Sequence, residues 1–131
     1  MFYLINLRLK RFKVPHLILE CSDNIIEENR QLLNILHDCQ QMLVENLPTS
    51  LESCKSRVVR HQDYLLGNGE VKNAFIHLEV RVLKGRSEEL LKRLAEELKT
   101  CISARLLKSL GNDLNLKLSV EVVELSGIYV N

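Results

Sequence analysis

The sequence predicts an α+β domain made of two successive β-α-β units, which together give a four-stranded sheet with two helices packed on one face. Three observations favour this fold. Each half of the 131-residue chain contains, in order, a strand-like stretch, a stretch with apolar residues at helical spacing, and a second strand-like stretch. The two halves have similar lengths. Each predicted helix begins with polar residues that can cap it.

The first unit begins with a short apolar run at residues 17–21, which is typical of a half-buried strand. Residues 22–24, Ser-Asp-Asn, then supply side chains that can cap a helix. Glu27 and Glu28 would lie in the first turn, where acidic residues interact favourably with the helix dipole. Apolar residues at helical spacing continue to about Glu45, where we expect the helix to end.

The remaining elements follow the same rules. The weak alternation of residues 56–66 predicts a second strand, and the strict alternation of residues 74–82 predicts the clearest strand of the chain. Ser87 is the expected cap of an amphipathic helix that runs to about Leu110. Residues 116–125 alternate again and form the last strand.

The predicted fold leaves one face of the sheet without helices. A β-α-β crossover pairs its strands in parallel and places its helix on one side, so two such units put both helices on the same side. A domain of this size has no further element to cover the opposite face. We therefore expect the chain to assemble as an oligomer.

Composition narrows the possible functions. With 46% hydrophobic residues the chain can bury the core of one domain, yet its apolar runs are too short to span a membrane. Aromatic residues make up 5% and Trp is absent, which argues against a surface that stacks nucleic-acid bases. The net charge of +1 conceals a basic segment at residues 1–13, which holds four of the 18 basic residues and no acidic one.

The four cysteines form no C-x-x-C pair, and no histidine lies at metal-ligand spacing from them. We therefore predict no metal site and expect reduced thiols in a cytoplasmic protein. In residues 1–13 the apolar residues come first and the basic residues last, which is the reverse of a secretory signal peptide. The cysteines are Cys21, Cys39, Cys54 and Cys101.

Residues 14–25, VPHLILECSDNI, are the most distinctive stretch of the chain. Further short motifs are Lys-Ser-Arg-Val at residues 55–58, Ala-Phe-Ile-His at 74–77 and Gly-Arg-Ser at 85–87. On these motifs the sequence resembles the bacterial 5-carboxymethyl-2-hydroxymuconate isomerases of the tautomerase superfamily, whose mature chains open with Pro-His. The resemblance extends to about Leu125.

The resemblance implies a tautomerase-like fold that assembles as a homotrimer, with the sheets around a central axis. It implies a cofactor-free keto–enol tautomerisation in bacterial homoprotocatechuate catabolism, a route that degrades aromatic compounds. In this family an N-terminal proline amine takes the proton of the 2-hydroxyl of the substrate and returns a proton to a distant carbon. The implied partner is a small polycarboxylate, with no role for nucleic acid or a membrane.

Carried onto this sequence, the resemblance makes Pro15 the general base and Arg86 the group that binds a carboxylate or the enolate. Lys55 stands where the family usually has a second substrate-binding arginine, and lysine lacks the bidentate guanidinium. Arg57, two residues further along the same strand, would face the same side and could compensate. His16 is a further candidate for lining the pocket, with a packing or interface role as the alternative.

The position of Pro15 within the chain decides between these functions. Only an N-terminal proline is a basic secondary amine, because the nitrogen of an internal proline belongs to an amide. We expect residues 1–14 to be a leader outside the mature protein and residues 15–131 to form the tautomerase-like domain. Either translation starts at Val14, or the leader is removed afterwards, or it remains.

Two other functions stay open. Lys55 in place of an arginine suggests a promiscuous tautomerase that acts on smaller enols. A retained leader would instead make the chain a non-catalytic trimeric binding module.

Overall fold

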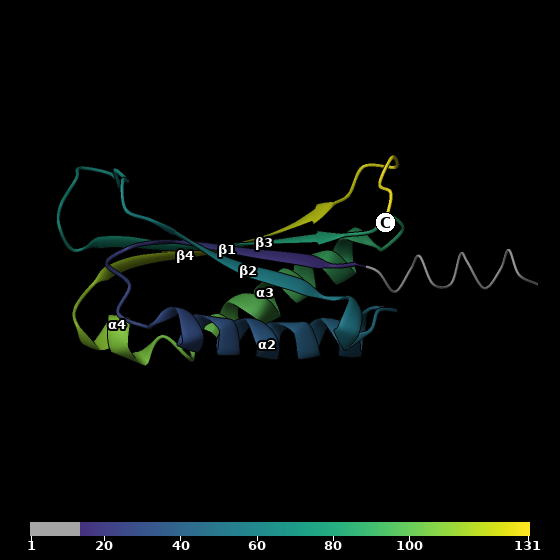
Figure 1. Ribbon diagram of the computed structural model, residues 1–131, viewed down its shortest axis with the longest axis horizontal. Helices are drawn as coiled ribbons and strands as arrows, with labels where there is room; N and C mark the ends of the chain where they lie inside the picture. The colour runs from purple at the N-terminus through teal and green to yellow at the C-terminus, as the bar shows by residue number, and fades with distance from the viewer. Residues whose placement is uncertain (1–13) are drawn as a thin grey trace, which may run out of the picture.

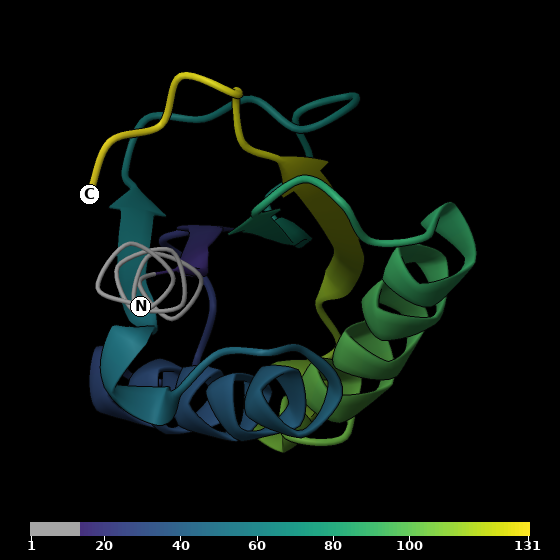
Figure 2. The same cartoon turned by 90° about the vertical axis from the view of Figure 1, so that its right-hand side faces the viewer.

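The computed structural model describes residues 14–131, so residues 1–13 of the expected leader lie outside the described part. A four-stranded sheet has the strand order β2-β1-β3-β4, and two long helices cover one of its faces (Figures 1 and 2). The strands are β1 (His16–Ser22), β2 (Lys55–His61), β3 (Asn73–Val82) and β4 (Asn115–Glu124). The helices are α2 (Asn29–Asn46), α3 (Glu88–Ser103) and the short η1 (Leu51–Ser53) and α4 (Leu107–Gly111).

Strand pairing confirms the predicted pair of β-α-β units. β1 and β2 are parallel, β3 and β4 are parallel, and β1 and β3 join the two units in antiparallel fashion. β1 and β2 therefore begin where β3 and β4 end. We call this edge of the sheet the Pro15 end, because Pro15 directly precedes β1.

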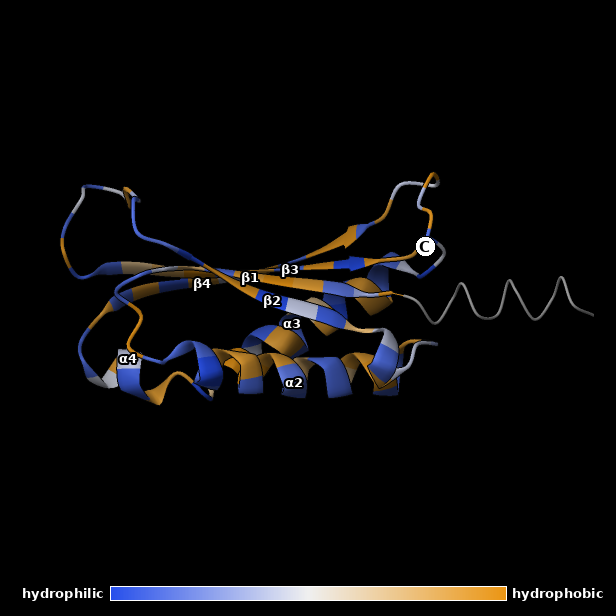
Figure 3. Ribbon diagram, viewed as in Figure 1, coloured by the Kyte–Doolittle hydropathy of each residue, from blue (hydrophilic) through white to orange (hydrophobic). Residues whose placement is uncertain are grey.

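The hydrophobic core lies between the sheet and the helices. Along β3, every second residue points toward the helices and is at most 3% exposed, as strict alternation predicts. Figure 3 shows hydrophobic colour along α2 where this helix faces the sheet. The core residues of α3 are Leu94, Leu98 and Ile102.

The opposite face of the sheet, which we call the open face, carries no helix (Figure 2). Its side chains are mainly polar or charged, including His77 and Glu79 of β3, although Val59 of β2 is 39% exposed. His77 Nδ1 lies 2.7 Å from the Ser119 hydroxyl, so this histidine has a polar partner within the sheet. The uncovered face agrees with the expected architecture.

Helix α2 begins later than the sequence predicts. Residues 22–24 do not cap it; Glu28 is the cap, and Gln31 accepts the Glu28 backbone N–H at 2.8 Å. Glu27 lies before the helix rather than in its first turn. Its carboxylate is 2% exposed and accepts the backbone N–H groups of Lys108 and Ser109 at the start of α4. These distant donors hold the preceding loop out of the helix.

Two other predicted boundaries were also wrong. β2 ends at His61 instead of residue 66, because its last partner in β1 is Ser22, beyond which no neighbouring strand supplies hydrogen bonds. Helix α3 ends at Ser103 instead of Leu110. The chain turns there and continues into α4, which leaves Leu107 73% exposed.

The buried carboxylate of Glu27 should contribute strongly to stability. A Glu27→Ala change leaves the donors of Lys108 and Ser109 without an acceptor, so we expect the free energy of unfolding to fall by about 2–3 kcal/mol. Urea denaturation measures this loss. Glu45→Ala, at an exposed position of α2, is the matched control and should change stability by less than about 0.5 kcal/mol. Equal stabilities of the two variants would contradict the assignment.

Candidate active site

Pro15 and Arg86 line the same small cavity at the Pro15 end. Val14, Leu47, Val82 and Leu83 complete its wall. The Pro15 carbonyl accepts the Lys55 backbone N–H at 3.0 Å, which extends the pairing of β1 with β2 by one bond. The cavity is largely apolar, with one guanidinium group at its wall.

The nitrogen of Pro15 is bonded to Val14 in this form of the chain. Val14 is 4% exposed, and its carbonyl accepts a hydrogen bond from the Thr49 hydroxyl. The nitrogen is therefore an amide without a basic lone pair. Proton abstraction by Pro15 requires a chain that begins at Pro15.

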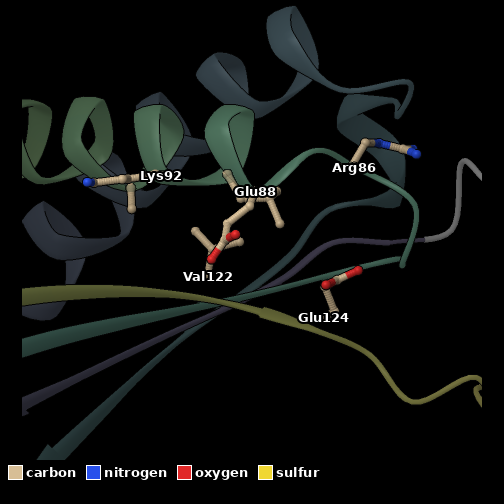
Figure 4. A pocket seen from close by; sticks show the side chains of 7 residues that line it. Arg86, Glu88, Lys92, Val122 and Glu124 are labelled. Carbon is tan, nitrogen blue, oxygen red and sulfur yellow. The ribbon is translucent and has the colours of Figure 1, made fainter.

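Arg86 lies between β3 and α3, one residue before the helix cap Ser87, whose side chain accepts the Leu90 N–H as predicted. Arg86 also lines a second cavity, of about 490 Å³, between α3 and the end of β4. Figure 4 shows its side chain pointing away from Glu88 and Lys92. Within residues 14–131 its guanidinium forms no ion pair, so the group is available for an anion.

The other predicted site residues lie together on the open face. His16 of β1 pairs in register with Lys55 of β2 and with Arg81 of β3. Arg57, two positions beyond Lys55, faces the same side, and its Nη1 donates to His16 Nδ1 at 3.1 Å. The structure therefore gathers three basic side chains around His16, of which the sequence analysis had not singled out Arg81.

Tyr129 is a further member of this group that the sequence analysis missed. Its hydroxyl lies 2.7 Å from His16 Nε2, and the two rings meet edge to face with centroids 5.9 Å apart. The residue belongs to the segment 125–131, which follows β4 and has no regular secondary structure. A single tyrosine in a segment without hydrophobic periodicity gives no signal that sequence analysis could use.

The environment of His16 keeps its ring neutral. Burial lowers the pKa of His16 below its usual value of 6.5, and the positive charges of Arg57, Lys55 and Arg81 lower it further. Both effects disfavour the imidazolium form. Near pH 7 the ring is therefore uncharged and acts as one hydrogen-bond donor and one acceptor.

The structure divides the predicted site into two groups. Pro15 and Arg86 line a cavity on the helix side of the sheet, whereas His16, Lys55 and Arg57 lie on the open face. The division follows from strand geometry, because successive residues of a strand point to opposite faces. Within one chain the two groups share the Pro15 end but do not form one pocket.

The other side chains that could take part in chemistry have packing or pairing partners. Burial raises the pKa of the Cys21 thiol, which favours a packing role. Glu20 and His61 form a pair at 2.7 Å on the open face. Among residues 14–131, no group of three His, Cys, Asp or Glu side chains is arranged to hold a metal ion. In the same part of the chain no helix is long and apolar enough to cross a membrane.

The double β-α-β fold, taken together with the family comparison, makes the chain an isomerase of the tautomerase superfamily. Comparison with known families identifies the group within this class. The model of the family described as 5-carboxymethyl-2-hydroxymuconate isomerase matches residues 15–129, and the chain belongs to that family. A search of curated proteins found no match.

Solved structures agree with this assignment. A 5-carboxymethyl-2-hydroxymuconate isomerase from Deinococcus radiodurans R1 is 28% identical with a TM-score of 0.78, and the match covers 92% of each chain. A 5-carboxymethyl-2-hydroxymuconate delta-isomerase has the same fold, with 18% identity, a TM-score of 0.77 and coverage of 94% of this chain and 90% of that one. A fused 4-OT wild-type symmetric trimer is 20% identical with a TM-score of 0.66, and 88% and 89% of the two chains are covered.

The charge of Arg57 should be visible in the titration of His16. An Arg57→Ala change removes a nearby positive charge, so the pKa of His16 should rise, but burial should keep it below 6.5. NMR titration of the ring protons measures the shift. Lys117→Ala, on the open face at the opposite end of β4, is the control and should leave the pKa unchanged. A pKa that stays constant or falls in Arg57→Ala would contradict the described contact.

Proposed function

We propose that this isomerase acts on 5-carboxymethyl-2-hydroxymuconate or a close relative, with Pro15 as the general base of a cofactor-free keto–enol tautomerisation. The observation that carries the proposal is the cavity that Pro15 shares with Arg86. The cavity combines a potential amine, apolar walls and a permanent cation, and the chain belongs to the isomerase family. His16, Lys55 and Arg57 lie outside this cavity, on the open face at the same end of the sheet, and in this proposal they bind carboxylates of the substrate that extend beyond it.

The chemistry balances without a redox partner. The free amine of Pro15 takes the proton of the 2-hydroxyl, the O–H bond breaks, and the electrons move through the conjugated system. A new C–H bond forms when the protonated amine returns a proton to a distant carbon. Apolar walls and the nearby cation would disfavour the protonated form of this amine, as a base at pH 7 requires.

Arg86 is the group that holds the negative charge in this proposal. Its guanidinium can donate two parallel hydrogen bonds to a carboxylate, and it stays charged throughout the reaction. Charge that develops on the enolate oxygen would be stabilised by the same donor. The absence of an ion pair to Arg86 among residues 14–131 supports this role.

The proposal requires that residues 1–14 are absent from the active protein and that the domain comprises residues 15–131. The family match supports this boundary because it begins at Pro15. Removal of Val14 would expose the Pro15 nitrogen and release the Thr49 hydroxyl from its present partner. Among the described residues, the domain would lose only the buried Val14 side chain and the hydrogen bond between Thr49 and Val14.

We further propose a cytoplasmic homotrimer that takes part in homoprotocatechuate catabolism. The uncovered open face supports an assembly, and a structure with the same fold is described as a symmetric trimer. The four cysteines are free, which suits a reducing compartment.

Two alternative functions each have one supporting observation. Lys55 directs its ammonium group to the Ser53 carbonyl at 3.3 Å and lacks the fork of an arginine, which favours smaller enols with fewer carboxylates. The burial of Val14 favours the second alternative, a non-catalytic trimeric binding module in which the leader remains. The activity of two forms of the chain separates these functions.

A chain that begins at Pro15 should isomerise the enol, whereas the full 131-residue chain should be slower by about 10²–10⁴-fold, which is the usual contribution of a general base. The decay of the enol absorbance measures the rate, and mass spectrometry verifies the first residue of each preparation. The substrate panel should include smaller enols to separate the two enzymatic functions. Equal rates of the two forms would rule out Pro15 as the base.

Replacement of Arg86 should affect catalysis more than folding. In the form that begins at Pro15, Arg86→Ala should lower kcat/KM by about 10²–10³-fold, the loss typical of a group that stabilises developing charge. Arg86→Lys should recover part of this loss because it keeps the charge without the fork. Arg93→Ala, at an exposed position of α3, is the control for a lost surface arginine. A loss in Arg93→Ala as large as in Arg86→Ala would contradict the assignment.

A further inference from the structure

The contact between Arg57 and His16 fixes the position of the proton on the imidazole ring. A guanidinium group has only N–H donors, so His16 Nδ1 must accept and cannot carry a proton. The neutral ring therefore has its proton on Nε2. The lowered pKa of His16 is consistent with this neutral form.

The proton on Nε2 then fixes the role of Tyr129. The Nε2–H donates to the phenol oxygen of Tyr129 at 2.7 Å. The phenol must direct its own hydrogen elsewhere, and within residues 14–131 no group accepts it. The hydrogen bonds therefore run in one direction, from the Arg57 guanidinium to His16 and from His16 to Tyr129. The O–H of Tyr129 is left without an acceptor among residues 14–131.

The charges around this donor favour an anion as its acceptor. Lys55, Arg57 and Arg81 surround His16. Arg81 forms an ion pair with Glu79 at 3.1 Å, whereas Arg57 forms none among the described residues. A carboxylate has two oxygens, so it can accept the phenol hydrogen with one and an N–H of Arg57 with the other. A neutral acceptor would leave the positive charge of Arg57 uncompensated.

The C-terminal segment is held by polar contacts, which are the backbone hydrogen bond from Leu125 N–H to the Val82 carbonyl and the contact of Tyr129 with His16. Ile128 and Val130 are 91% and 87% exposed, whereas Tyr129 between them is half-buried against His16. Burial of the two aliphatic residues would turn the tyrosine outward. In this arrangement the phenol reaches His16 on the open face at the Pro15 end.

We propose that Tyr129 is a substrate-binding residue, whose hydroxyl, held by His16, binds together with the Arg57 guanidinium a substrate carboxylate that extends from the Pro15 end onto the open face. This assignment rests on the proposed polycarboxylate substrate and adds a residue to its binding site. Through its contact with both Arg57 and Tyr129, His16 acts as a positioning residue.

Adipate is a suitable probe, because this six-carbon dicarboxylate cannot tautomerise and is transparent in the near ultraviolet. Isothermal titration of the full chain should give a Kd that Tyr129→Phe raises about tenfold, as expected for the loss of one hydrogen bond to a charged group. Tyr64→Phe, in the loop between β2 and β3, should leave the Kd unchanged. His16→Phe combined with Tyr129→Phe should weaken binding by less than the product of the single effects.

A spectroscopic measurement separates binding from mere anchoring of the segment. The chain has three tyrosines and no tryptophan, so its near-ultraviolet spectrum reports mainly on the phenols. Adipate should produce a tyrosine difference spectrum that is present in Tyr64→Phe and absent in Tyr129→Phe. A residue that only anchors the segment would give no such signal.

The proposal is overturned if adipate does not bind the wild-type chain, or if Tyr129→Phe binds it as tightly as wild type does. It is also overturned if the difference spectrum persists in Tyr129→Phe. Because this assay uses the full chain and needs no free amine, it remains informative if the form that begins at Pro15 proves inactive. An inactive form that begins at Pro15 would refute the proposed function. Adipate binding that depends on Tyr129 would still support the assignment of Tyr129.

Discussion

The central position of β1 determines the arrangement of everything that bears on function. β1 lies between a parallel and an antiparallel neighbour, so its first residues meet the start of β2 and the end of β3 at one edge. Pro15 and Arg86, which are far apart in the sequence, therefore reach one cavity. The same pairing brings Arg57 and Arg81 to either side of His16. A different strand order would separate these groups whatever the side chains were.

Much of this architecture was predictable because strands and helices leave periodic patterns. Residues 74–82 alternate strictly since one face of β3 is fully buried, and the strand was predicted to within one residue of its observed start, Asn73. The start of α2 was not predictable. Residues 22–24 have the composition of a helix cap, and nothing nearby indicates that Glu27 accepts hydrogen bonds from Lys108, 81 positions away.

The candidate site shows the same limit. The resemblance drew attention to Pro15 and Arg86, and strand alternation placed Lys55 and Arg57 on one face. The predicted site residues lie on two faces of the sheet. This division becomes clear only when it is known to which face Pro15 and the first residue of β1, His16, each point. Tyr129 could not be predicted, because its contact with His16 joins residues 113 positions apart through a segment without periodicity. Contacts of this kind depend on the complete fold.

The hydrogen bonds that Glu27 accepts also show how the two β-α-β units depend on each other. Glu27 belongs to the first β-α-β unit, yet each hydrogen bond that its carboxylate accepts comes from Lys108 or Ser109 in the second. Neither unit on its own could bury this group with its partners. A chain cut between the two units would therefore yield two incomplete fragments instead of two small domains. Although the two units repeat the same order of elements, they form one cooperative folding unit.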